Sequence, residues 1–94
     1  MASTFSCLRY HVVFSTKERR PLIRDDWRPR LHSWMGGVVR KLDGVSLDIG
    51  GVADHGHLLA SLKPVHVLAD VMREIKHASS KWIHDEIGDR KFAW

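Results

Sequence analysis

The stretch Gly50–Leu62 limits the folds that this chain can adopt more than any other stretch, because two apolar runs meet there at a short polar junction. Just after the junction, His55 and His57 stand two residues apart. Successive side chains of a β-strand point to opposite faces, so both imidazoles would project from one face while alternate apolar residues anchor the other. The pattern predicts a hairpin whose second strand holds two imidazoles side by side.

Two imidazoles in this arrangement are typical of a site for a divalent metal. Imidazole is a common metal ligand, and two protein ligands leave coordination positions open for water or phosphate oxygens. The chain has seven histidines among 94 residues, so one such pair can also arise by chance. We treat His55 and His57 as candidate metal ligands and leave a purely structural role open.

Size and charge narrow the class of protein. A length of 94 residues predicts a single domain, residues 1–94, with one modest core. The 15 Lys and Arg exceed the 11 Asp and Glu, which suits a polyanionic partner, although many basic domains bind no nucleic acid.

Cysteine content and hydropathy bear on location. Because Cys7 is the only cysteine, the chain cannot form an intrachain disulfide. Without a signal peptide or an apolar run of about 20 residues, we expect a cytoplasmic location and no membrane partner.

The first half of the chain predicts a strand followed by a helix. Apolar and polar residues alternate over Phe5–Phe14, as in a half-buried strand. A helix is expected to begin after the N-cap Asp25-Asp26, and Gly36-Gly37 inside it suggests close packing or a bend. Its expected core-facing stripe, at helical spacing, comprises Trp27, Leu31, Trp34, Val38 and Leu42.

The second half predicts two strands, the longest helix and the start of another strand. Val45, Leu47 and Ile49 alternate with polar residues and are expected to face the core. The long helix should run from Val67 to about Ile87 and end at Gly88, with a new apolar run over 91–94.

This order is α+β, the ferredoxin-like or RRM-like βαββαβ arrangement, with one antiparallel sheet, two helices on one face and a truncated last strand. The first strand would lie antiparallel beside the third, which brings its end toward His55 and His57. Tyr10 would then lie well over about 10 Å from both histidines.

Two sets of basic residues are candidates for contact with DNA. The loop after the first strand carries Lys17, Arg19 and Arg20, and Arg and Lys supply most contacts to nucleic-acid backbones. The long helix carries a polar side, opposite its apolar face, that includes Arg73, Lys76 and Lys81. Both sets can equally be solvated surface.

Four blocks of the sequence carry a resemblance to a known family. The chain resembles the IS200/IS605-like transposases, small single-tyrosine enzymes of the HUH class that are also found as REP-associated transposases. The resemblance covers almost the whole chain in order, and several blocks at the right intervals are more specific than any one. These blocks are Tyr10–Lys17 with Arg19–Pro21, Gly51–Leu59, Ile75-Lys76 with Ser79–Trp82, and Phe92–Trp94.

The resemblance implies a function in DNA transposition and recombination. Such proteins bind DNA as homodimers and cut and rejoin single-stranded DNA at hairpin-marked transposon ends, without a nucleotide cofactor. By resemblance, His55 and His57 bind Mg²⁺ or Mn²⁺, which polarises the scissile phosphate. A tyrosine then attacks, leaving a 5′-phosphotyrosyl intermediate and a free 3′-hydroxyl. Asp54 is a further candidate, as a partner of the histidines or a replacement ligand.

Two features of this chain depart from the family. Position 56 is glycine where the family has a bulky apolar residue, which removes a packing anchor between the ligands. The family's nucleophilic tyrosine and a further metal ligand lie beyond the Phe-Ala-Trp block, whereas Tyr10, the only tyrosine, matches the first strand. We therefore expect the chain as given to lack the nucleophile and to be inactive.

Two other functions stay open at this stage. One is a non-catalytic, dimeric module that binds single-stranded or hairpin DNA through the basic residues. The other is a ferredoxin-like interaction module unrelated to DNA. A dimer is expected because an open sheet edge invites pairing with a second chain.

Overall fold

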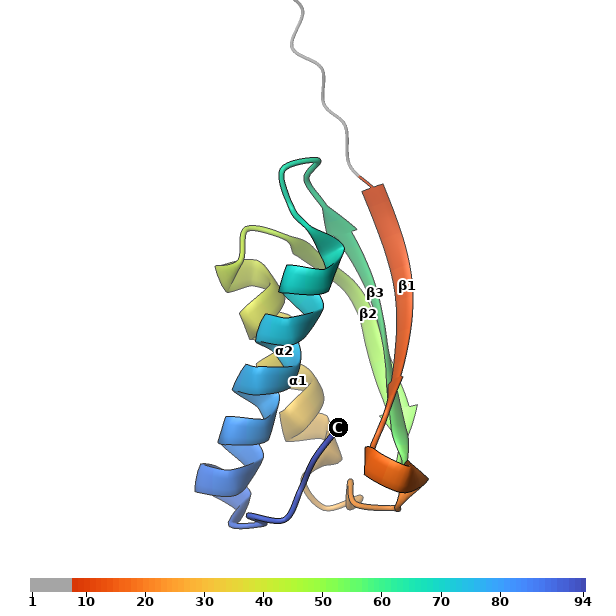
Figure 1. Ribbon diagram of the computed structural model, residues 1–94, viewed down its shortest axis with the longest axis vertical. Helices are drawn as coiled ribbons and strands as arrows, with labels where there is room; N and C mark the ends of the chain where they lie inside the picture. Colours follow the sequence, from red (N-terminus) through yellow and green to blue (C-terminus); the bar gives the residue numbers. More distant parts are fainter. Residues whose placement is uncertain (1–7) are drawn as a thin grey trace, which may run out of the picture.

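The computed structural model describes residues 8–94, which form two layers: a three-stranded sheet and two helices that cover one of its faces (Figure 1). The α+β class and the order strand, helix, strand, strand, helix confirm the prediction. In chain order they are β1 (Leu8–Ser15), the 3₁₀ turn η1 (Lys17–Arg19), α1 (Arg28–Lys41), β2 (Val45–Val52), β3 (His55–Leu62), α2 (Leu68–Trp82) and the π-helical turn η2 (Ile83–Ile87).

The sheet has the order β1-β3-β2, and both pairs are antiparallel. Ser15 pairs with His55 and Val13 with His57, so the end of β1 lies beside the start of β3, as predicted. β2 and β3 form the predicted hairpin, with Ala53 and Asp54 in its turn. The predicted first strand began at Phe5; residues 5–7 lie outside the described part of the chain.

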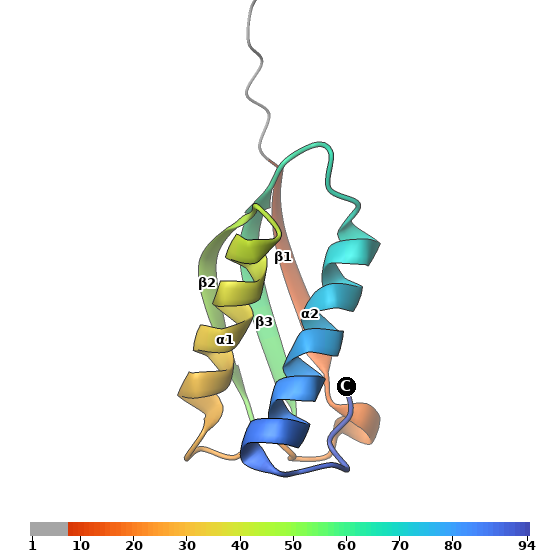
Figure 2. The same ribbon diagram turned by 90° about the vertical axis from the view of Figure 1, so that its left-hand side faces the viewer.

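The core lies between the sheet and the helices. Along β3, Gly56, Leu58, Ala60 and Leu62 are buried while the residues between them are partly exposed. Leu31, Met35 and Val39 of α1 and Ile75 of α2 are almost inaccessible to solvent, and a fully buried side chain of this kind contributes about 1.5–3 kcal/mol. Figure 2 shows α1 in front of β2 and α2 on the side of β1.

The two glycines of α1 have different surroundings. A Cβ atom at Gly36 would lie 3.6 Å from both the Ile49 and the Ser46 side chains of β2, which is an ordinary van der Waals contact. Gly36 thus faces β2 without a contact that requires glycine, and the reason for the Gly36-Gly37 pair stays a prediction.

The predicted core-facing stripe of the first helix is confirmed except at Trp34: Trp27 and Leu31 are buried, and Val38 and Leu42 pack against the core. The helix begins at Arg28 rather than after the expected cap, and Asp25 instead pairs with the Arg28 guanidinium at 2.8 Å. Trp34 is 43% exposed, and the residues that the helix buries are Leu31, Met35, Gly36 and Val39. The reason is that α1 contacts α2 as well as the sheet, and Trp34 turns toward α2.

β2 also differs from its predicted alternation. Its register with β3 shifts between Ser46 and Asp48, so Leu47 is an extra residue in a β-bulge. Val45 and Leu47 are consequently exposed, and only Ile49 of the three expected residues packs against the core. An inserted residue reverses the in-and-out phase of a strand, and bulges are frequent at sheet edges such as β2.

The chain after α2 ends its helical path at Gly88, which adopts a left-handed φ of 90° as predicted for the stop. Residues 91–94 do not form the predicted start of a strand. They lie beside the end of β1, where Lys17 N donates to Ala93 O at 2.9 Å and the Trp94 ring packs edge-on against Phe14. A single backbone bond is less than a strand ladder requires. None of the helices in residues 8–94 has the length and apolar character to cross a membrane.

Candidate functional site: the histidine face

The hairpin turn between β2 and β3 is held by the segment that follows β1. Thr16 N donates to Asp54 O at 2.9 Å, and Ile23 N donates to Ala53 O at 2.9 Å. The buried Thr16 hydroxyl lies 2.6 Å from Arg20 O and 3.0 Å from Asp54 O, so it can donate to either carbonyl. The basic loop and the hairpin turn are therefore one hydrogen-bonded unit.

His55 and His57 project from the face of the sheet that the helices leave uncovered. Each imidazole side chain is 33% exposed, whereas Gly56 between them is buried on the helix side. A Cβ atom at Gly56 would come within 3.4–3.5 Å of the Phe14 ring. Phe14 thus fills the space beneath this glycine, so a packing anchor is supplied from β1 instead.

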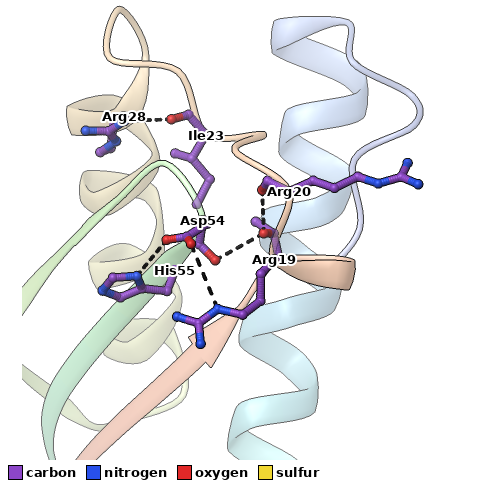
Figure 3. Close-up of polar contacts among 7 residues, drawn as sticks. Arg19, Arg20, Ile23, Arg28, Asp54 and His55 are labelled. Atoms are coloured by element: carbon purple, nitrogen blue, oxygen red, sulfur yellow. Dashed lines mark hydrogen bonds and ion pairs between the residues drawn. The ribbon is translucent and has the colours of Figure 1, made fainter.

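A carboxylate in the turn orients His55 (Figure 3). His55 Nδ1 lies 2.8 Å from Asp54 Oδ1, and Asp54 Oδ2 lies 3.9 Å from Arg19 Nε. The hydrogen bond with His55, helped by the charge of Arg19, lowers the pKa of Asp54 below its usual value. With Nδ1 occupied by the carboxylate, Nε2 is the nitrogen of His55 that can bind a metal.

His57 is placed mainly by packing. Its ring lies over Gly50 of β2, where an added Cβ atom would come within 2.6 Å of ring atoms Cε1 and Nε2. Asp48 Oδ2 lies 3.7 Å from Nε2, and the His11 ring of β1 meets the His57 ring edge-on with centroids 5.7 Å apart. His57 therefore has a neighbour on each flanking strand.

Sequence reasoning missed both neighbours of His57. The alternating patterns of the two strands predict only that Asp48 and His11 are polar positions. The signal that would have found them is the strand register: His57 pairs with Gly50 and with Val13, so Asp48 and His11, each two residues earlier, fall on the same face.

The structure places Tyr10 away from the histidines. Tyr10 pairs with Ala60 and packs against the core on the helix side of the sheet. It lies three positions along β1 from the partner of His57 and five from the partner of His55, about 10 and 16 Å of strand, and on the opposite face of the sheet. Within residues 8–94, no group of three His, Cys, Asp or Glu side chains is placed to hold a metal.

The predicted basic residues lie along two grooves. Lys17 and Arg20 line one of about 410 Å³, and Arg73 and Lys76 line another of about 650 Å³ beside α2. Ala93 lines both grooves, so the C-terminal segment lies between the two basic sets. The remaining two residues lie elsewhere: Arg19 is near Asp54, and Lys81 pairs with Asp85 at 2.9 Å outside the larger groove.

A family model and curated proteins that match this chain are all described as IS200 transposases. The family model described as "Transposase IS200 like" matches residues 4–94. The transposases for insertion sequence element IS200 of Salmonella typhimurium LT2 and Salmonella typhi are each 30% identical over 90 residues, covering 92% of this chain and 57% of their own length. The chain therefore spans little more than half of these curated relatives.

A solved structure shows the same fold. A protein of Deinococcus radiodurans R1, provisionally assigned as a transposase, superposes with a TM-score of 0.88 at 22% identity, over 97% of this chain and 70% of its own. Together with the family model, which covers nearly the whole sequence, this places the chain clearly: it belongs to the IS200-like transposase family.

Proposed function

We propose that the histidine face binds Mg²⁺ or Mn²⁺ and serves the metal-dependent cleavage and rejoining of single-stranded DNA at transposon ends. The observation that carries the proposal is the pair of imidazoles on one exposed face, with His55 Nδ1 held by Asp54 so that Nε2 is directed to a ligand. The family membership of the chain supports the reaction class.

Two imidazoles alone do not favour Mg²⁺ or Mn²⁺, because both metals prefer oxygen ligands. The proposal therefore depends on water and phosphate oxygens at the remaining coordination positions, and the choice of metal comes from the family resemblance. A metal bound there would polarise a phosphate oxygen of the DNA. Carboxylates that bond to metal-binding histidines fix the tautomer and raise the basicity of the ring, which is the role we assign to Asp54.

The chain's own basic residues would position the DNA. Arg19 lies between the Asp54 carboxylate and solvent with a side chain 70% exposed, and Arg20 is 67% exposed beside Glu18. A phosphate bound by Arg19 would lie close to His55, whereas the Arg20 side chain points away from His55 (Figure 3) and lines the groove with Lys17. The grooves that carry Lys17, Arg73 and Lys76 would extend this contact along the strand.

The second candidate function is DNA binding without chemistry. Tyr10 faces the helices, and residues 8–94 place two imidazoles but no third ligand on the histidine face. Both observations favour a module that binds single-stranded or hairpin DNA through its basic grooves. In that case the histidines would make no difference to binding.

The test is a titration with Mn²⁺ followed by electron paramagnetic resonance, on the wild-type chain and on His55→Ala/His57→Ala. The double variant should lose Mn²⁺ binding, and the control His77→Ala, an exposed histidine of α2, should keep it. An unchanged titration of the double variant would refute the metal site.

The same variants, incubated with end-labelled hairpin DNA, separate the candidate functions. Metal-dependent cleavage on a denaturing gel that disappears with the two histidines supports the proposed reaction. Salt-dependent binding that survives their loss favours the binding module. No binding even at low salt would favour the interaction module unrelated to DNA.

We further propose that the protein is a homodimer. β1 and β2 are the edge strands of the sheet formed by residues 8–94, and an exposed edge offers unpaired backbone groups to a second chain. Light scattering at micromolar concentration should give twice the mass of the chain, and a monomer would contradict the proposal.

A further inference from the structure

The outer side of α1 carries a regular stripe that the histidine face does not use. Arg30, Trp34, Gly37 and Lys41 follow one another at steps of four, three and four residues, so they share one side of the helix. At 1.5 Å per residue the stripe spans about 16 Å. Over its whole length α1 contains four Arg and Lys and no Asp or Glu.

The stripe borders a groove of about 470 Å³ between α1 and α2. Trp34, Gly37 and Lys41 line it from α1, and Glu74 and Ala78 line it from α2. The nearest atom to a Cβ added at Gly37 is 3.7 Å away, in the Arg40 guanidinium. Gly37 therefore leaves the middle of the groove open, between the Trp34 ring and the Lys41 side chain.

Trp34 is held in position and yet accessible. Its ring stacks on Trp82 of α2 at 6.3 Å with an interplanar angle of 20°, and its Nε1 donates to Ala78 O at 3.2 Å. Despite both contacts, 43% of the residue is exposed. An indole whose orientation is fixed in this way loses little conformational freedom when a second flat ring packs against it.

The charges at the two ends of the stripe are available to a ligand. Arg30 lies 5.4 Å from the centroid of the Trp82 ring, a cation–π contact that leaves its N–H donors free. Within residues 8–94, neither Arg30 nor Lys41 forms an ion pair with a carboxylate. Glu74, on the opposite wall, would repel phosphates toward α1.

We propose that the Arg30–Lys41 stripe is a second nucleic-acid surface, which binds a short single-stranded segment with one base stacked on Trp34. Arg30 and Lys41 would contact its phosphates, and Glu74 would face the base edges, where a carboxylate accepts from exocyclic amino groups. Aromatic rings between basic residues are the common means of binding single strands without sequence preference. This surface belongs to the helical layer, behind the sheet from the histidine face, and requires no metal.

The test measures the anisotropy of fluorescein-labelled oligo-dC and oligo-dT in EDTA, which removes any contribution of metal at the histidine face. Trp34→Ala should weaken binding roughly 5- to 100-fold. Trp34→Phe, which keeps a stacking ring, should retain most of the affinity. Arg90→Gln, an exposed basic residue outside the stripe, is the matched control and should bind as the wild type does.

A second variant, Lys41→Gln, tests the same surface without removing the Trp34 indole, whose loss could disturb the fold. It should reduce the dependence of log K on log salt by slightly less than one, the effect expected for one phosphate contact. Wild-type affinity in Trp34→Ala with unchanged circular dichroism, or an unchanged salt slope in Lys41→Gln, would overturn the proposal. Failure here is distinct from failure of the metal site, because His55→Ala/His57→Ala should retain the Trp34-dependent binding.

Discussion

His55 and His57 occupy equivalent positions on one strand, yet the molecule holds them in different ways. His55 belongs to the turn end of the hairpin, where a carboxylate 2.8 Å from Nδ1 fixes its ring. His57 lies two residue pairs further into the sheet, where its nearest carboxylate is 3.7 Å away and its ring lies over Gly50. The His55 imidazole is therefore oriented by a hydrogen bond, and the His57 imidazole by its packing over Gly50.

This difference shows which contacts each imidazole needs to keep its orientation. The orientation of His55 depends on one polar side chain and on the backbone bonds that place the turn. The orientation of His57 depends on the absence of a side chain on the neighbouring strand. Substitutions that remove one support at a time should therefore affect the two imidazoles separately.

The largest effect is expected from Gly50→Ala. The new Cβ atom would come within 2.6 Å of the His57 ring, and since the far end of a histidine can move, the imidazole would be displaced while the sheet remained folded. Substituting a residue that hydrogen-bonds to a metal ligand lowers metal affinity by up to roughly 100-fold. Displacing the His57 imidazole, which is itself a ligand in the proposed site, should lower Mn²⁺ affinity by at least that much. Mn²⁺ affinity measured by electron paramagnetic resonance checks this prediction.

Gly56→Ala is the matched control, in the same hairpin but on the helix side. Its Cβ atom would make an ordinary contact with Phe14 at 3.4 Å and leave both imidazoles in place. Equal losses of Mn²⁺ affinity in the two variants would mean that the hairpin as a whole, rather than the space over Gly50, places His57.

A smaller effect is expected from Asp54→Asn, which keeps the size of the side chain but removes the charge that orients His55. Loss of such a partner should lower Mn²⁺ affinity about tenfold, at the low end of the usual 10- to 100-fold range, because the turn also positions the ring. Asp48→Asn is the comparison: at 3.7 Å its carboxylate is beyond hydrogen-bond distance of His57, and its loss should change affinity less. The reverse order would show that His57, too, is oriented by charge.

The sequence predicts the pairing of the strands from the order of the elements, and the common face of the two histidines from period-two alternation in β3. It predicts most of the buried side of α1 but not the exposure of Trp34, which contacts Trp82 and Ala78 of α2 while Met35 lies in the core. Nor does it predict the neighbours of His57. The bulge at Leu47 shifts the phase of β2, and His11 reaches His57 only through a pairing between distant segments.

The smallest effect is expected from Thr16→Val, which tests the hydroxyl contacts that hold the hairpin turn beside His55. His57 lies further from this turn and, within residues 8–94, has no such contact. The valine keeps the shape of the buried side chain and the backbone bond from residue 16 to Asp54 O, but it removes the hydroxyl near Arg20 O and Asp54 O. Loss of one hydrogen bond should lower the free energy of unfolding by about 1 kcal/mol in urea denaturation. Ser15→Ala, the exposed neighbour, should change it by less than about 0.5 kcal/mol. If Thr16→Val left the stability unchanged, the hydroxyl would not couple the basic loop to the turn, and the turn beside His55 would be held by the backbone bonds of residues 16 and 23.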